Sequence, residues 1–200
     1  MFCSTGPTGA TGENGATGAT GNTGATGPAA ECCDCGCVQQ MVNLLSQIIE
    51  LYPTDNVVVS MESGENVSGH AGALLPPPNT NINAGLLQLN NSQGVPQEAV
   101  SICRIAAIRV TSTTYNQNIT YLPAPSPLPI GCGANCESAV RSYLPVNTTG
   151  AHLKAGGQTV GQGLVIENQY GVIVVVGPNN SDPSFVSTCK VEVMTKDIDV

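Results

Sequence analysis

Residues 171–189 read Gly171-Val-Ile-Val-Val-Val-Gly-Pro-Asn-Asn-Ser-Asp-Pro-Ser-Phe-Val-Ser-Thr-Cys189, and this stretch decides the fold because the chain contains a second version of it. The earlier version reads Gly85-Leu-Leu-Gln-Leu-Asn-Asn-Ser-Gln-Gly-Val-Pro-Gln-Glu-Ala-Val-Ser-Ile-Cys103, with the same spacing from glycine to cysteine. Both versions place a turn rich in Asn, Ser, Gly and Pro between two mostly apolar runs, as in two joined β-strands. The repetition predicts two copies of one β unit.

The residues around the earlier version predict a set of short strands. Apolar side chains alternate from residue 57 onward, residues 63–66 resemble a hairpin turn, and the prolines of 76–78 predict a loop because proline cannot donate to a sheet ladder. Five short, bent strands after a helix indicate a small SH3-like or Sm-like β-barrel. The expected strands cover residues 57–61, 67–75, 85–89, 99–103 and 105–110.

A helix is expected before each set of strands. Between Val38 and Tyr52, apolar residues recur at i, i+3, i+4 and i+7, and Pro53 ends the pattern. This helix either packs on the strands that follow it or forms a bundle that sets the register of the N-terminal arm. Residues 136–144 predict a shorter helix in the second copy.

These patterns predict a mainly β protein in which a short collagen-like arm precedes two tandem helix-plus-small-β-barrel repeats. Residues 1–30 form the arm, and residues 31–122 hold a cysteine cluster, the amphipathic helix and the first barrel. Residues 123–200 hold a proline-rich linker, the short helix and the second barrel.

The arm has glycine at every third position of residues 6–29, in eight unbroken triplets. This is the pattern of the collagen triple helix, in which only glycine fits near the common axis of three chains. A flexible, low-complexity arm is the alternative interpretation. The threonines of the triplets are candidates for O-glycosylation, with ordinary solvation as the alternative: Thr8, Thr11, Thr17, Thr20, Thr23 and Thr26.

Charge and hydropathy restrict the partners. The net charge is −8, and the six basic residues are scattered, so a phosphate-binding surface for nucleic acid is not expected. The sequence contains no run of eighteen apolar residues, which a membrane-spanning helix would need, and residues 1–4 do not resemble a signal peptide. The expected partners therefore include neither nucleic acid nor membrane.

Nine cysteines are present, and four of them fall within residues 32–37. Such a cluster suits bonds between chains or between segments, since adjacent cysteines do not readily bond each other. A metal site and free thiols are the alternatives, but the spacing lacks paired C-x2-C motifs. All nine are disulfide or cross-link candidates: Cys3, Cys32, Cys33, Cys35, Cys37, Cys103, Cys132, Cys136 and Cys189.

The cysteines differ in the role expected for them. Cys103 and Cys189 occupy equivalent positions of predicted strands and are expected to be buried structural thiols, with a bond as the alternative. Cys132 and Cys136 lie at a helix start, where a thiolate is favoured, and are expected to be cross-link partners. The cysteines on or beside the arm are expected to form bonds between subunits and not to stabilise the core of a single chain.

Catalytic motifs are lacking from the sequence. It contains no Gly-x-Ser-x-Gly, no phosphate-binding loop and no His-Glu-x-x-His, and its carboxylates are sparse and separated. We therefore expect no enzymatic activity, no cofactor and no metal ion.

The run Gly-Pro-Thr-Gly-Ala-Thr-Gly resembles the collagen-like glycoproteins of the bacterial spore surface, which form the exosporium nap and related filaments of bacilli and clostridia. The resemblance covers residues 6–29, and the threonine-rich, proline-poor triplets carry it. The cysteine content is similar to that of the cysteine-rich exosporium proteins of clostridia, which assemble into disulfide-stabilised layers. The nap glycoproteins differ in having a trimeric jelly-roll domain after a long stalk.

The resemblance implies a structural, self-assembling protein of the spore surface, in an exosporium layer or an appendage. Its partners would be further copies of itself, as a trimer or a larger lattice or fibre, and other spore-surface proteins. It would be made in the mother-cell cytosol without a signal peptide. The alternatives are a collagen-like phage or cell-surface fibre protein and an Sm-like binding module.

Overall fold

The computed structural model of the chain describes residues 34–76 and 85–197. The chain divides into two units, residues 1–30 and 31–200. The glycine-rich arm, its threonines and Cys3, Cys32 and Cys33 lie outside the described residues. The structure therefore bears on the second unit alone.

The described part of the chain contains two α-helices and ten β-strands, which confirms the mainly β prediction. In chain order, one helix precedes each group of five strands. The bounds are α1 Asp34–Leu51, β1 Asn56–Met61, β2 Asn66–Leu75, β3 Leu86–Asn90, β4 Pro96–Ser101, β5 Ile105–Thr111, α2 Cys132–Tyr143, β6 Ala151–Ala155, β7 Gln158–Gln169, β8 Val172–Val176, β9 Ser184–Ser187 and β10 Val193–Thr195.

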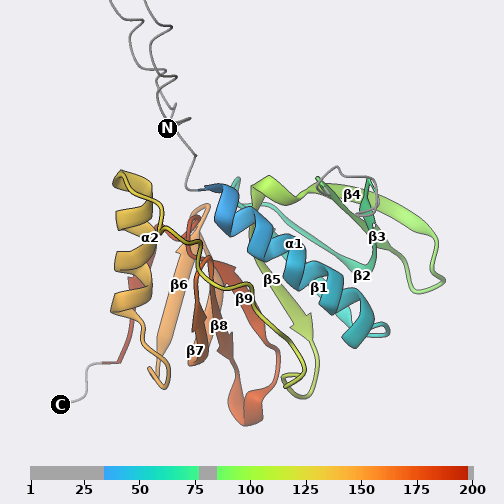
Figure 1. Cartoon of the computed structure of the whole chain (residues 1–200). Helices are drawn as coiled ribbons and strands as arrows, with labels where there is room; N and C mark the ends of the chain where they lie inside the picture. The colour runs from blue at the N-terminus through green and yellow to red at the C-terminus, as the bar shows by residue number, and fades with distance from the viewer. Residues whose placement is uncertain (1–33, 77–84, 198–200) are drawn as a thin grey trace, which may run out of the picture. The chain divides into compact units, whose positions relative to one another are not determined.

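All ten described strands belong to one antiparallel sheet, in the order β10-β6-β7-β8-β9-β5-β1-β2-β3-β4 (Figure 1). The pairing joins the two expected groups of five strands into one sheet. In the first half, β4 pairs with β3 and β5 pairs with β1, but β4 and β5 are not neighbours in the sheet. The free side of β5 instead pairs with β9 of the second half.

The two halves of the sheet have the same strand order, and the matching strand pairs share their register over most of their length. Within the first half, Val59 of β1 lies opposite Val67 of β2 and Ile108 of β5. Within the second, Leu153 of β6 lies opposite Gly161 of β7 and Met194 of β10. The agreement extends to a register shift at the matching place in each half, between Ala71/Ala73 and between Val165/Glu167.

The helix α1 packs its apolar face on the sheet, as the first interpretation of its sequence pattern expected. Its buried side chains belong to a core that also includes β1, β3, β5 and the faces of β8 and β9 turned toward it. Figure 1 shows α1 lying across the strands of the first half. The buried side chains that α1 supplies to this core are Met41, Leu44, Leu45 and Ile48.

A second core lies against α2. Val140 of α2 and Leu144, which directly follows α2, are buried with Ala151, Leu153 and Ala155 of β6. The opposite face of β8 and one face of β5 also reach this core, through Ile173, Val175, Ala106 and Ala107. Because β5 and β8 are buried on both faces, the two halves share their central strands and do not form independent domains.

The segment directly before the expected proline-rich linker contacts α1. Gln47 accepts hydrogen bonds from the backbone N–H of Thr120 at 2.8 Å and from its hydroxyl at 3.0 Å. Gln40 accepts a hydrogen bond from the N–H of Leu122 at 2.9 Å. Amide side chains on the helix therefore hold the chain in place just before the linker begins.

Candidate functional site

The junction between the two halves is the most distinctive site in the described structure, and we define it as strands β5 and β9 with the disulfide Cys37–Cys189. The strands pair antiparallel although Ala107 and the opposite residue, Val186, are 79 positions apart in the sequence; Ile108 likewise lies opposite Phe185. The ladder makes one sheet out of two similar sets of five strands.

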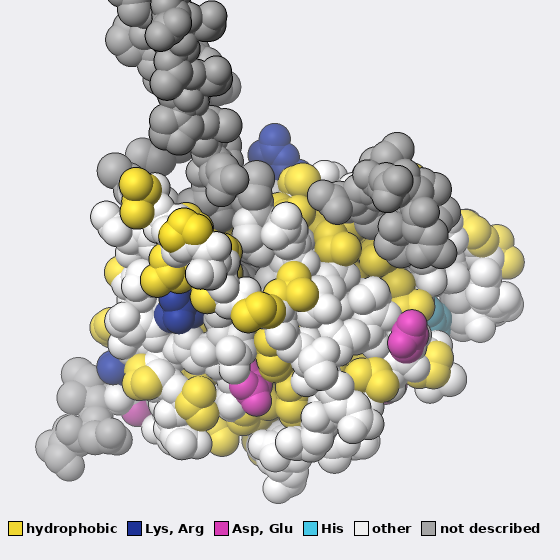
Figure 2. All heavy atoms as spheres, viewed as in Figure 1, with side chains coloured by type: hydrophobic (Ala, Val, Ile, Leu, Met, Phe, Trp, Pro, Cys, Tyr) yellow, Lys and Arg dark blue, Asp and Glu magenta, His cyan; other side chains and the backbone are white. Residues whose placement is uncertain are grey.

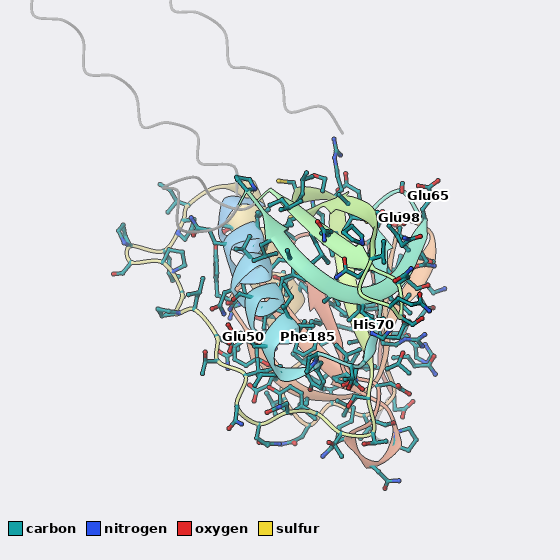
Figure 3. All side chains as sticks on the ribbon, turned by 90° about the vertical axis from the view of Figure 1, so that its right-hand side faces the viewer. Glu50, Glu65, His70, Glu98 and Phe185 are labelled. Carbon is teal, nitrogen blue, oxygen red and sulfur yellow. A yellow bond between two sulfur atoms is a disulfide. The ribbon has the colours of Figure 1, made fainter. Side chains whose placement is uncertain are left out.

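Pairing at the junction buries β9 completely. Phe185 is 0% exposed, lies in the interior in Figure 3 and packs its ring against Tyr115, with 6.3 Å between ring centroids. The register places Ala99 of β4 in the position that matches Phe185, and Ala99 is exposed. The same strand position is therefore covered in one half and open in the other.

A disulfide fixes the junction on its helical side. Cys37 near the start of α1 is bonded to Cys189 in the turn after β9, with 6.2 Å between the Cα atoms. The neighbouring backbones are close, since a Cβ on Gly36 would lie 2.5 Å from the Tyr170 ring. A Cβ on Gly171 would lie 3.1 Å from the Cα of Cys37. Glycine at both positions lets the start of α1 approach the β7–β8 turn.

This bond corrects two expectations from the sequence. Cys37 was grouped with cysteines that link subunits, yet its side chain is 2% exposed and its bond lies within one chain. Cys103 was expected to be buried, and it is an exposed free thiol. Neither lies within a strand: Cys103 is in the short 3-10 helix Ile102–Arg104 after β4, and Cys189 is in the turn after β9.

Glu137 of α2 places a buried carboxylate beside the same turn. The side chain is 2% exposed, and it accepts hydrogen bonds from the Gly171 N–H at 3.0 Å and the Thr188 hydroxyl at 3.1 Å. The Arg141 guanidinium, four residues later on α2, donates to it at 2.7 Å. A buried charge satisfied in this way is costly to disturb, so Glu137 fixes α2 to the backbone next to Cys189.

Glu62 links the halves from the other side. Its carboxylate pairs with Arg104 of the first half and, at 3.0 Å, with Lys190 of the second. Burial raises the pKa of Glu62, but the hydrogen bonds from Arg104 and Lys190 outweigh it and hold the pKa below the ordinary value. Lys190 follows Cys189 directly, so an ion pair and a disulfide hold the same turn.

Equivalent hairpin turns of the two halves also meet. Gly64 lies in the β1–β2 turn and Gly156 in the β6–β7 turn, both with positive φ. A Cβ on Gly64 would lie 2.5 Å from the carbonyl oxygen of Gly156, and a Cβ on Gly156 would lie 2.5 Å from the Gly64 nitrogen. This close approach requires glycine on both sides.

The described structure has two free cysteines, Cys103 and Cys136, and both are exposed. Cys103 follows β4, which has one neighbour in the described sheet, and Cys136 lies on α2. Cys132 and Cys35 have helical backbones, and their side chains are outside the description. The sequence predicted cross-linking cysteines in general but did not separate the bonded pair from the free pair.

A shallow groove of about 530 Å³ opens beside the junction, lined among others by Ser60, Arg109, Gln162 and Asp182. Its lining combines one guanidinium with one carboxylate and several hydroxyl and amide groups, an arrangement that suits weak polar binding. Among the described side chains, no three metal-ligand residues come together. Figure 2 shows a face of the molecule on which charged side chains are few and separated.

Comparison with known proteins identifies no relative of this chain. No family model, curated protein or solved structure gives a significant match. None of the helices in the described residues is sufficiently long and apolar for a transmembrane span.

Proposed function

We propose that this chain is a structural protein of the bacterial spore surface that assembles with itself into a disulfide-linked layer or appendage. The observation that carries the proposal is the combination of exposed free thiols with open sheet edges. Cys103 and Cys136 are exposed, and β4 and β10 each have one partner within the described sheet. Unpaired strand edges invite pairing with another chain.

The chain's organisation also supports assembly. The proposed plan is a collagen-like arm followed by two tandem copies of a helix and five strands, and the matching registers of the two halves agree with a duplication. The glycine triplets call for three chains if they wind. The remaining cysteines of the cluster, Cys32, Cys33 and Cys35, offer further thiols for bonds between subunits.

The spore surface is proposed because it reconciles the cysteines with the place of synthesis. A protein made in a reducing cytosol keeps its thiols reduced, and release to an oxidising exterior then allows them to cross-link. The resemblance of the glycine triplets to spore-surface glycoproteins points to the same location. A role as structural material accords with few charges and with junctions built from backbone pairing.

Immunogold labelling of intact spores tests the location, with vegetative cells as the control. We expect label on the outermost spore layer, and extraction of the protein by denaturant only when a reductant is added. Label confined to vegetative cells or to phage particles would contradict the proposal. Release by denaturant alone would contradict the cross-linking.

A further inference from the structure

The two edges of the described sheet match the two strands that meet at the junction. β9 pairs with β8 through Ile173 opposite Val186, and β4 pairs with β3 in the same register through Leu87 opposite Val100. The edge strand β4 is therefore the first half's counterpart of β9.

The other edge follows the same rule. β10 pairs with β6 through Leu153 opposite Met194, in the register by which β5 pairs with β1 through Val59 opposite Ile108. Hence β10 is the second half's counterpart of β5. Within the chain, β9 (the counterpart of β4) already pairs with β5. The remaining two strands, β4 and β10 (the counterpart of β5), lie at the two ends of the described sheet.

The free cysteines match the bonded ones in the same way. Cys103 follows β4 as Cys189 follows β9, at the same distance from the paired strand residues. On the helices, Cys37 precedes buried Met41 and Leu45 by four and eight residues, and Cys136 precedes buried Val140 and Leu144 by the same intervals. The exposed pair Cys103 and Cys136 thus corresponds to the bonded pair Cys189 and Cys37.

Cys103 and Cys136 are placed for a bond between chains. Cys103 follows β4 in the short 3-10 helix Ile102–Arg104 and lines the same small hollow as Cys37, whereas Cys136 lies on α2, which packs on β6. In Figure 1, β4 lies to the right of α1 and α2 lies to its left. Both thiols are exposed and neither is bonded within the chain, so each is open to a second molecule.

We propose that β4 of one chain pairs with β10 of a second copy, and that Cys103 of the first forms a disulfide with Cys136 of the second. The inference rests on the proposed function and specifies the contact through which copies of the chain would assemble. The bond forms when an oxidant such as dioxygen takes two electrons from the two thiols and their two protons are released. The expected opposite residues, transferred from the junction, are Val193 with Val100, Met194 with Ala99 and Thr195 with Glu98.

Backbone geometry at the junction shows which groups would pair. Val110 donates its N–H to the Pro183 carbonyl at 2.9 Å, so, two residues along an antiparallel ladder, the N–H and C=O of Phe185 face β5. By the matching register, the N–H and C=O of Ala99 point away from β3, toward the open edge. Glu98 lies at the surface on the same strand (Figure 3).

The contact is head-to-tail, since it joins two different surfaces of the same chain. Such contacts produce a closed ring when the rotation between neighbours closes and an open filament when it does not. Val193 supports burial at this edge, because it is 51% exposed while its counterpart Ala107 is 1% exposed. Addition of a second copy would cover it.

Isotope mixing tests the bond. Unlabelled and ¹⁵N-labelled full-length chains are reduced, refolded together and oxidised in air, and disulfide-linked peptides are identified by mass spectrometry. We expect peptides linking Cys103 to Cys136 in mixed-isotope form. The Cys37–Cys189 link serves as the internal control and should carry a single isotope.

The possible results separate this inference from the proposed function. Assemblies joined only through Cys32, Cys33 or Cys35, or through Cys103 to Cys103, would overturn the inference and leave self-assembly standing. Cys103–Cys136 links found only in single-isotope form would also overturn it. Chains that stay monomeric after oxidation would overturn both.

A matched pair of variants tests the strand pairing. Ala99→Pro removes the outward N–H, whereas Ala99→Thr keeps it and adds a side chain at the same exposed position. We expect Ala99→Pro to reduce the yield of the Cys103–Cys136 bond roughly tenfold or more, and Ala99→Thr to retain it. The β-sheet circular dichroism and the Cys37–Cys189 bond should be unchanged in both. Equal yields in the two variants would exclude pairing through β4.

Discussion

Cys37 and Cys189 are bonded across 152 residues of sequence and join the first helix to the last turn of the second half. The bond closes a junction that strand pairing, a Glu62–Lys190 ion pair and two touching glycine turns also hold. The junction therefore serves as the internal model for how one chain could join the next.

Loss of this disulfide should destabilise the monomer. Cys189→Ser opens a very long loop, and we expect the free energy of unfolding to fall by about 2–4 kcal/mol in denaturant titrations. Cys103→Ser is the control, because that thiol is free and exposed, and it should change the value by less than about 0.5 kcal/mol. Equal effects of the two substitutions would show that the Cys37–Cys189 bond does not support the fold.

The contact between the hairpin turns should be sensitive to one methyl group. Gly156 and Gly157 both have positive φ, at 57° and 74°, so alanine strains the backbone at either position. A Cβ on Gly156 meets the Gly64 nitrogen at 2.5 Å, whereas nothing lies within 4 Å of one on Gly157. We expect Gly156→Ala to lower the free energy of unfolding by at least about 1 kcal/mol more than Gly157→Ala does. Equal free energies of unfolding in the two variants would mean that the turns do not touch.

Acid should weaken the junction through Glu62. Its pKa is lowered in the folded state from the ordinary 4.5, so its stabilising contribution is present above about pH 4.5 and is lost as the pH falls through the folded value. We expect Glu62→Gln to destabilise the protein at neutral pH and to have a smaller effect at about pH 3. Urea titrations at both pH values measure this, with Glu65→Gln as a charge-matched, exposed control. A loss of stability that is the same at both pH values would contradict the ion-pair account.

The strand positions could be predicted from the sequence because period-two alternation and turn residues are local signals. The helix α1 was likewise predicted from its apolar spacing, and the repeated stretch at residues 85–103 and 171–189 corresponds to β3–β4 and β8–β9. The pairing of β5 with β9 could not be predicted, since edge pairing depends on which edges come together after folding. Two barrels and one continuous sheet have the same local patterns.

The cysteine roles were hidden for a similar reason. Sequence spacing predicted that Cys103 and Cys189 are equivalent, and equivalence suggested the same environment for both. Their environments differ because β9 has a neighbour on each side and β4 lies at an end of the described sheet. One sequence signal could have identified Cys136 as the counterpart of Cys37. Each of the two cysteines is followed by apolar residues four and eight positions later.

The number of chains is a separate prediction. Glycine triplets form a triple helix only when three chains come together. If pairing of β4 with β10 closes a ring of three copies, that ring would bring the three arms together. We expect the oxidised protein to have the native mass of three chains and to show a triple-helical circular dichroism signal at low temperature. Substituting Gly15 or Gly18 with alanine should lower the melting of that signal and leave the β signal unchanged. An unaltered signal in both variants would exclude a wound arm.

The central claim is that cysteines bind one chain to the next, and the mass of the oxidised full-length protein in strong denaturant without reductant tests it most directly. Sedimentation analysis should show covalent multiples of the chain, which dithiothreitol converts to single chains. The double variant Cys103→Ser with Cys136→Ser should lose the bonds between β4 and α2 and shift the distribution to smaller species. A parent protein that sediments as single chains after full oxidation would contradict the account.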